Sequence, residues 1–533
     1  MSDGELAPSL HDACDRWAAR PAITFRGDTL TYAEVAERIG ALTAGYRRLG
    51  IGLGDRVICQ LPNRPEHLFA MSAAWACGAI HVGTDNDLTG PELARLVERT
   101  EAAGLVYQPR ADRPDPMEPL AAVRRASPGT RIIVHNGNGR DGSAAASGVD
   151  HVSLHELVAS APLPPAPAPP AIDASSPALL LLTSGTTGKP KAIPESLEHC
   201  WAKMQFFADA FGPGPDDVHL VFLPIGHVFG LRLALIPLLS GGRLVLLDRF
   251  SPQEALRLVT DDGFTVLPGM PTHLRLLVDR LDPSRHDVSS LRWAISAAAT
   301  LPRPLTEAVY ELLGVEMLYV YGCSEGFTTQ TIDRDEILSG SVGATVFRGP
   351  PGTAPAGTVT ILDPDGRTEL PAGRTGEIAF GARQPVRYWD DPEVATDGWY
   401  HTGDLGQMDA EGRVYFVGRL KELINRGGLK VAPGEIETAL TRHPAVADAA
   451  VVATPDPVLG EAICACVVVS EGASPVLDDV RRFPGQTLAR HKMPDELCLL
   501  DHIPRTKIGK VDRATLAAMI VDEDRPRERL RPR

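Results

Sequence analysis

The sequence lacks any apolar run long enough to span a membrane, and no N-terminal stretch resembles a signal peptide. It also lacks an excess of positive charge, because 53 Lys and Arg face 68 Asp and Glu, for a net charge of -15. This balance argues against nonspecific binding to nucleic acid or to an anionic membrane surface, although anionic ligands need only a local basic site. We therefore expect a cytoplasmic protein with no nucleic-acid partner and no membrane insertion.

The eight cysteines show no zinc-like spacing. Cys464 and Cys466 stand two apart in an apolar segment, so they share one face of a predicted strand, where core packing explains them. We expect reduced thiols and no metal site built from cysteine. We also find no internal repeat.

The chain of 533 residues is too long for one hydrophobic core and predicts three to four domain-sized units. Segments with strand character alternate with segments of helical periodicity from residue 56 to 83 and again from residue 218 to 319. This alternation is typical of a doubly wound, parallel α/β sheet. A capping box at Thr31–Glu34 predicts a helix carrying Val35, Ile39 and Tyr46 on one face.

Two changes of texture divide the chain. Residues 161–176 are rich in Pro and Ala, which predicts an extended linker or surface loop. From Gly357 the segments shorten and are separated by Asp-Gly and Ala-Gly turns, which predicts a small antiparallel β-domain. A last unit from about Lys421 mixes helices and strands, and the charged end of the chain is expected to be disordered.

The most informative stretch is ALLLLTSGTTGKPKA, residues 178–192. Its leucines predict a buried strand that ends abruptly in a loop of Gly, Thr and Lys. Flexible backbone, hydroxyl groups and ammonium groups are what a triphosphate requires of its binding loop. The loop is not a Walker loop, since Pro190 stands where Ser or Thr should follow the Gly-Lys pair. A polar surface hairpin is the alternative interpretation.

Two further motifs offer carboxylates in loops. Tyr321-Gly-Cys-Ser-Glu325 follows a predicted parallel strand, whose carboxyl end is the usual ligand-binding edge of an open sheet. The segment ends in a carboxylate suited to magnesium. Tyr400-His-Thr-Gly-Asp404 ends in a carboxylate that could accept two hydrogen bonds from a ribose diol. Each motif alone is also compatible with an ordinary turn or helix cap.

The order of the motifs is more specific than any one of them. TSGTTGKPK, YGCSE, GEIAFG with Tyr388-Trp389, YHTGD, GRLKELINRGG and PRTKIGK occur in the succession typical of the adenylate-forming superfamily, which the chain resembles from about residue 25 to 515. That superfamily includes acyl- and aryl-CoA ligases, stand-alone aryl-acid adenylating enzymes and luciferases. The resemblance implies an α/β fold with a large N-terminal part of doubly wound sheets, a small β-barrel-like subdomain and a small, mobile α+β C-terminal domain. The expected boundaries are 1–420 for the N-terminal part, with its β subdomain from about 340, 421–515 for the mobile domain and 516–533 for a tail.

The resemblance also assigns roles to residues. In the loop around the β- and γ-phosphates it places Thr183, Ser184, Gly185, Thr186, Thr187 and Lys191. Tyr321 would pack on adenine, Ser324 would contact phosphate, Glu325 would hold Mg2+, and Asp404 and Arg419 would bind the ribose. Lys421 matches the hinge, Lys510 the lysine that touches the carboxylate and the α-phosphate, and Gly427 and Gly428 the lining of a thiol channel. His227 would act at the acid site, with the alternative that it is a core histidine.

The chemistry implied is a two-step reaction with ATP, Mg2+ and CoA. A substrate carboxylate attacks the α-phosphate and expels pyrophosphate, and a thiol then displaces AMP after the C-terminal domain rotates. Charge gathers at one phosphorus in the first step, so cations and a metal are needed rather than a protein nucleophile.

Departures from the superfamily pattern bear on the substrate. The segment Pro224-Ile-Gly-His227-Val-Phe-Gly230 lacks the Asn that aryl-acid members carry after this His. The usual Gly-Gly pair beside the acid pocket is Ala297-Ala298, and Phe229 with these two alanines offers apolar wall. We therefore expect a carboxylic acid–CoA ligase acting on an apolar acyl or alicyclic acid. The alternatives are an aryl-acid–AMP ligase that loads a separate carrier protein, a non-catalytic relative, and a luciferase-like oxygenase that shares the first step.

Overall fold

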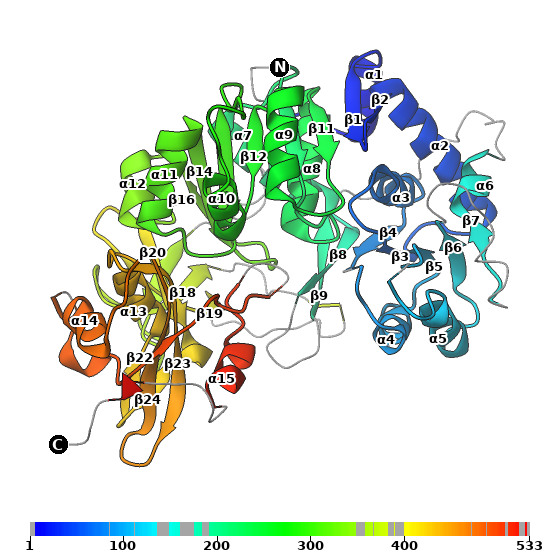
Figure 1. Cartoon of the computed structure of the whole chain (residues 1–533). Coiled ribbons are helices and arrows are strands. Elements are labelled where there is room, and N and C mark those ends of the chain that lie inside the picture. Colours follow the sequence, from blue (N-terminus) through cyan, green and yellow to red (C-terminus); the bar gives the residue numbers. More distant parts are fainter. Residues whose placement is uncertain are drawn as a thin grey trace.

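A computed structural model describes residues 6–84, 86–110, 112–135, 149–159, 175–183, 191–347, 358–365, 367–381, 388–389, 399–470, 472–486, 488–506, 510–521 and 528–529. Two α/β subdomains lie side by side, and the C-terminal third lies beneath the second of them (Figure 1). The predicted linker at residues 161–176 falls almost entirely outside the described residues.

The first subdomain is built on a seven-stranded sheet that is parallel except for its last strand. In spatial order the strands are β7 (Val152–Ser153), β6 (Arg131–Val134), β5 (Gly104–Tyr107), β3 (Arg56–Gln60), β4 (Ile80–Gly83), β8 (Pro177–Thr183) and β9 (Lys191–Ser196). Its helices are α2 (Tyr32–Arg48), α3 (Pro65–Ala76), α4 (Gly90–Thr100), α5 (Glu118–Ala126) and α6 (Leu154–Ala159). The capping box predicted at Thr31–Glu34 is present and begins α2, with Val35 and Tyr46 buried as expected.

The second subdomain is built on a nine-stranded mixed sheet. In spatial order the strands are β16 (Thr345–Val346), β15 (Thr328–Thr331), β14 (Glu316–Gly322), β13 (Trp293–Ala297), β12 (Val266–Pro268), β10 (Val218–Val221), β11 (Arg243–Leu246), β1 (Pro21–Phe25) and β2 (Asp28–Thr31). Its helices are α1 (Leu10–Arg16), α7 (Leu197–Phe211), α8 (Val228–Ser240), α9 (Pro252–Asp262), α10 (Pro271–Val278), α11 (Arg303–Leu313) and α12 (Arg334–Ser339). The N-terminal strand β1 thus pairs with β2 and with β11, which lies far along the chain. Neither β1 nor β2 belongs to the seven-stranded sheet of the first subdomain.

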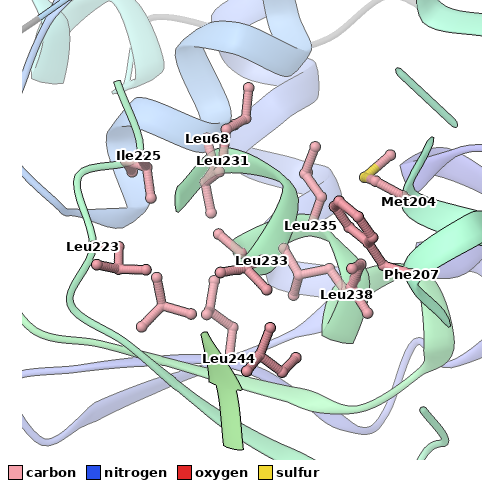
Figure 2. Close-up of a cluster of buried hydrophobic side chains, with 14 of the residues drawn as sticks. Leu68, Met204, Phe207, Leu223, Ile225, Leu231, Leu233, Leu235, Leu238 and Leu244 are labelled. Carbon is pink, nitrogen blue, oxygen red and sulfur yellow. The ribbon is translucent and has the colours of Figure 1, made fainter. Parts of the chain in front are cut away.

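One buried apolar cluster joins the two subdomains. Leu68 of α3 belongs to the same cluster as Met204 of α7, Leu231 of α8 and Leu244 of β11 (Figure 2). Burying leucine-sized side chains stabilises such a junction by roughly 1.5–3 kcal/mol each. The two subdomains therefore share one hydrophobic core.

The predicted β subdomain is a four-stranded antiparallel sheet in the order β17 (Val359–Leu362), β18 (Gly376–Gly381), β19 (Trp399–Met408) and β20 (Val414–Arg419). It begins later than the expected residue 340, because β16 still pairs with β15 of the nine-stranded sheet. The segment near residue 340 nevertheless contacts the β subdomain, because the Val342 N–H donates to the Val414 carbonyl of β20.

The last domain is a small α+β unit. Its elements are the 3-10 helix η2 (Leu420–Glu422), β21 (Ile424–Arg426), β22 (Leu429–Val431), α13 (Pro433–Leu440), β23 (Val446–Asp456), β24 (Gly460–Val469), α14 (Leu477–Arg482), two further 3-10 turns η3 (Pro484–Gln486) and η4 (Arg490–Lys492), β25 (Glu496–Leu499), α15 (Arg513–Val521) and β26 (Glu528–Arg529). Cys464 and Cys466 lie buried on one face of β24, as predicted.

The expected tail from residue 516 is wrong. Helix α15 continues to Val521, and Leu516 and Ile520 are buried against the sheet. The short strand β26 then pairs with β25. Leu516 and Ile520 are four residues apart, so they lie on one apolar face of α15. The charged residues that follow make this apolar pattern hard to recognise in the sequence.

Candidate active site

The loop predicted to bind phosphate connects β8 to β9, which pair as an antiparallel hairpin. Ser184, Gly185, Thr186 and Thr187 lie outside the described residues. The base of the hairpin is described, and Thr183 there pairs with Lys191. A hairpin is what the surface-turn interpretation also required, so the surroundings of the base decide between the two.

Residues of two other predicted motifs surround the base of this hairpin. The Lys191 ammonium donates to the Tyr388 hydroxyl at 3.1 Å, and that hydroxyl donates to Glu325 Oε1 at 3.2 Å. Three motifs that lie between 63 and 197 residues from one another thus meet through one tyrosine. This convergence favours a ligand-binding loop over a plain surface turn.

Glu325 lies in the turn between β14 and β15, next to Ser324, at the carboxyl end of β14. Half-buried Tyr400 is close to it, and desolvation, with Glu325 among the negative neighbours, raises the pKa of the Tyr400 hydroxyl. Among the described residues no group of three or more His, Cys, Asp or Glu side chains could hold a metal by itself. A lone carboxylate nevertheless fits Mg2+, which is commonly held by one or two carboxylates together with substrate phosphates.

Asp404 and Arg419 are directly paired partners on β19 and β20. Arg419 Nε lies 3.1 Å from Asp404 Oδ1, and the Tyr321 hydroxyl donates to Asp404 Oδ2 at 2.9 Å. Burial raises the pKa of Asp404, and Arg419, Tyr321 and Lys510 oppose this shift. The two residues predicted to bind ribose are therefore neighbours, and Tyr321 of the adenine assignment is bonded to one of them.

Lys510 is brought to the same place although it belongs to the C-terminal domain. Its pKa is lowered by burial and by the nearby Arg419, while Asp404 and Glu422 act in the opposite direction. Arg513 fixes this segment, because its guanidinium donates to Glu422 at 2.8 Å and to Glu437 at 2.6 Å. The lysine predicted to act on the α-phosphate thus lies within electrostatic range of the predicted ribose pair.

The predicted acid pocket lies where the two α/β subdomains touch. His227 occupies the N-cap position of α8 without a side-chain capping hydrogen bond, and Phe229 is half-buried in the first turn. Gly226 and Gly83 face each other so closely that a Cβ on Gly226 would lie 2.3 Å from the Thr84 carbonyl oxygen. Side chains at these two positions would force the subdomains apart beside the pocket.

Ala297 is buried at the end of β13, whereas Ala298 is exposed and has a φ of +71. This is left-handed backbone, which glycine adopts freely and alanine does not. The superfamily's preference for glycine here therefore has a conformational reason, and Ala298 keeps the conformation at a cost.

The hinge and thiol-channel predictions lie in the C-terminal domain. Lys421 is exposed within η2, directly after the last strand of the β subdomain. Gly427 and Gly428 form the tight turn between β21 and β22, with φ of +58 and +87. No contact that we observe tests the role of any of the three, so these assignments stay predictions.

Sequence reasoning missed three supporting residues. Tyr388 and Tyr400 appear in the sequence analysis only as members of motifs, without a role. In the structure both hydroxyls interact with Glu325. Asn63 was not noticed at all: its side chain donates to the Leu223 carbonyl and accepts from Ile225 N–H, both at 2.9 Å. Asn63 thereby holds the segment that leads to His227. Its only sign in the sequence is that a polar residue follows shortly after the buried strand β3.

Comparison with known proteins agrees with this geometry. Residues 10–387 match the AMP-binding enzyme family, and residues 435–510 match the AMP-binding enzyme C-terminal domain. The chain is 34% identical to Triostin synthetase I from Streptomyces triostinicus, over 98% of this chain and 95% of that protein. It is 31% identical to 4-coumarate–CoA ligase 5 from Oryza sativa subsp. japonica, over 93% and 90% of the two chains. The structure resembles ATP-bound MatB from Rhodopseudomonas palustris with a TM-score of 0.81 and 28% identity, over 97% and 99% of the two chains.

The site and these matches define an adenylate-forming ligase, an ATP-binding enzyme that adenylates a carboxylic acid. The chain belongs to the AMP-binding enzyme family, within the adenylate-forming superfamily. In the part of the chain that the structure describes, no helix is long and apolar enough to cross a membrane.

Proposed function

We propose that the protein is a carboxylic acid–CoA ligase that uses ATP and Mg2+ and acts on an acid with an apolar body. The first step is supported by Lys510, whose charge interacts with those of the paired Asp404 and Arg419. An ammonium group in this place stabilises the negative charge that gathers on the α-phosphate as the carboxylate attacks.

Each group has a defined task in this proposal. Asp404 accepts hydrogen bonds from the ribose, and Lys191 neutralises charge near the phosphate loop. Glu325 would hold Mg2+, which supplies charge stabilisation for the departing pyrophosphate. Tyr388 orients Glu325 and Lys191 relative to one another through the hydroxyl that joins them. His227 contacts the acid at the start of α8.

The second step requires a different position of the C-terminal domain. Its two buried clusters contain only residues from 424 to 520, and the large N-terminal cluster ends at Val414. A domain with its own core can move as a unit. We propose that it rotates about Lys421, withdraws Lys510 and brings Gly427 and Gly428 to the thiol.

CoA is preferred over a carrier protein as thiol acceptor for two reasons. The acid segment His227-Val-Phe-Gly230 lacks the aryl-family Asn. A relative at 31% identity is a 4-coumarate–CoA ligase. Loading of a separate carrier protein by an aryl-acid–AMP ligase is the second candidate.

The test is pyrophosphate release across a panel of carboxylic acids, measured with and without CoA. We expect release with selected acids, and acyl-CoA only when CoA is present. Pyrophosphate release without any acyl-CoA product would move the assignment to the carrier-loading alternative. Absence of release with every acid would overturn the proposal.

A further inference from the structure

A group of four ionisable side chains, three of them buried and His199 half-buried, lies behind the active-site turn that carries Glu325. Its members come from three elements and are Glu195 of β9, His199 and Lys203 of α7, and Arg232 of α8. Lys203 is 0% exposed, Arg232 4% and Glu195 5%. Interiors this dry hold charge only where it is paired or awaits a partner.

The pairing within this cluster is incomplete. Arg232 Nη2 donates to Glu195 Oε1 at 2.5 Å, and among the described residues Glu195 Oε2 has no hydrogen-bond partner. His199 Nε2 stands 3.9 Å from the same oxygen. Among the described residues, the Lys203 ammonium has no hydrogen-bond partner at all.

The unpartnered ammonium faces the active-site loop. A Cβ built on Gly326, the residue after Glu325, would lie 3.6 Å from Lys203 Nζ and 3.2 Å from His199 Nε2. On the other side Lys203 Nζ is 5.6 Å from the ring centroid of Phe347. Gly326 has a φ of +117 and no side chain, so both nitrogen atoms come close to its backbone.

The cluster is also continuous with the expected acid pocket. Arg232 follows Phe229 by three residues on α8, and residues at this spacing share one helix face. Phe229 of the expected acid pocket therefore shares a helix face with Arg232, whose ion pair with Glu195 belongs to the cluster around Lys203.

We propose that Lys203 is a specificity-determining residue that binds a hydrogen-bond acceptor on the acid, at the end remote from the reacting carboxylate. This inference rests on the proposed function and deepens it. Below pH 8 the cluster holds two cations, Lys203 and Arg232, and one carboxylate, so an anionic acceptor is favoured over a neutral one. The substrate is then an acid with an apolar body and a second polar terminus, rather than a wholly apolar acid.

The direct test compares matched acids in ATP–pyrophosphate exchange. The pairs are hexanoate with adipate, and 3-phenylpropionate with 3-(4-hydroxyphenyl)propionate and 3-(4-carboxyphenyl)propionate. We expect the acceptor-bearing member to be favoured in kcat/KM by about 10- to 100-fold, the range of one hydrogen bond to a charged group. In Lys203→Met, which keeps the length and apolar stem, this preference should fall to within about twofold.

Two readouts separate specificity from support of the fold. In Lys203→Met the acceptor-free acid and the KM for ATP should change by less than about threefold. Arg257→Met, which removes one cation from the exposed face of α9, is the control and should keep the wild-type preference. Equal loss for both members of each pair in Lys203→Met would reduce Lys203 to a structural role and overturn the inference.

A wild-type measurement decides the matter if Lys203→Met does not fold. Burial lowers the pKa of Lys203 to about 8 and that of His199 to about 4, and raises those of the neighbouring Cys200 and Cys323 to about 12. Glu195 stays ionised, because its pKa is lowered despite burial, and Arg232 stays charged. Between pH 6 and 9 Lys203 is therefore the member of this group that titrates.

The KM for the acceptor-bearing acid should accordingly rise as the pH passes upward through about 8, and the KM for its acceptor-free partner should not. Parallel pH profiles for the two acids, or a wild-type enzyme without preference, would contradict the inference and leave the ligase assignment intact. Failure of every acid to support exchange would contradict both.

Discussion

Lys510 provides the clearest residue-level prediction, because adenylation in our proposal requires its positive charge and its surroundings disfavour that charge. Its ammonium form is the one that stabilises the α-phosphate charge, and burial with Arg419 nearby lowers its pKa. The kcat/KM for ATP in adenylation should therefore fall as the pH rises through a pKa below the 10.5 of an ordinary lysine. Lys510→Arg, which stays charged, should lose this alkaline limb.

Lys510→Ala should slow acyl-adenylate formation by about 10²- to 10³-fold, the usual loss for one preorganised donor. Thioester formation from supplied acyl-adenylate should persist, because that step does not use Lys510 in our proposal. Equal damage to both half-reactions, each measured in single turnover, would end the assignment.

Glu325 and Tyr388 can be separated by a matched pair of variants. Glu325→Gln keeps the shape and loses the charge, so adenylation should drop steeply and recover in part at raised Mg2+. Tyr388→Phe removes only the hydroxyl that joins Lys191 to Glu325, and a lost hydrogen bond of about 1 kcal/mol predicts roughly a fivefold decrease. Its Mg2+ dependence should match that of the wild type. If Glu325→Gln also shows an unchanged Mg2+ dependence, Glu325 is structural.

Ala297 and Ala298 are neighbours for which glycine should have opposite effects. Ala298→Gly relieves a left-handed alanine and should stabilise the fold by up to about 1 kcal/mol. Ala297→Gly lies in a strand and should destabilise by about 0.5–1 kcal/mol, while it widens the range of acids accepted. Thermal midpoints and an acid panel check both. A lower midpoint for Ala298→Gly would contradict the strain argument.

At the scale of elements, the N-terminus of α13 packs directly against the backbone of β20. A Cβ on Gly434 would lie 2.1 Å from the Val417 carbonyl oxygen, and the atoms on both sides are backbone. Gly434→Ala should push the C-terminal domain off this seat and slow adenylation at least tenfold. Thioester formation from supplied acyl-adenylate should be spared. Gly129→Ala, at a glycine with open space around it, is the control, and unimpaired adenylation in Gly434→Ala would show that the seat is not needed.

Elements with a local signal were predicted well from the sequence. The leucine run gave β8, the Thr31 capping box began α2, and β23 and β24 appeared as apolar segments. Strand partners have no such local signal, since pairing depends on distant residues. The position of β1 beside β11, and of β16 outside the β subdomain, could therefore not be foreseen.

The candidate site shows the same division. Motifs predict roles for Glu325, Asp404, Arg419 and Lys510. The structure pairs Asp404 with Arg419 and links Glu325 to Lys191 through Tyr388, and the roles of all four stay predictions. Lys203 could not be found, because a lysine in an amphipathic helix usually faces solvent, and only packing reveals that it does not. Asn63 likewise matters only through the segment it touches across the subdomain junction.

For the whole molecule, the hinge decides which half-reaction is possible. Lys421 lies in the first turn of a 3-10 helix, where proline is tolerated and its fixed φ is compatible. Lys421→Pro should therefore hold the present orientation, in which Lys510 reaches the ribose pair. Adenylation should continue and thioester formation should fail. Wild-type acyl-CoA turnover in this variant would rule out rotation about this residue.

The pairing of β1 with β11 also has a consequence for how the chain is made. Phe25 leaves the ribosome more than two hundred residues before Leu246, its partner in the sheet. At 5–20 residues per second that interval is roughly 10–45 s, far longer than a hairpin needs to form. Until β11 is made, β1 lacks this partner, and an unpaired strand edge is a site for pairing with the wrong chain. Translation speed and chaperone supply, more than the stability of the finished enzyme, should therefore limit its soluble yield.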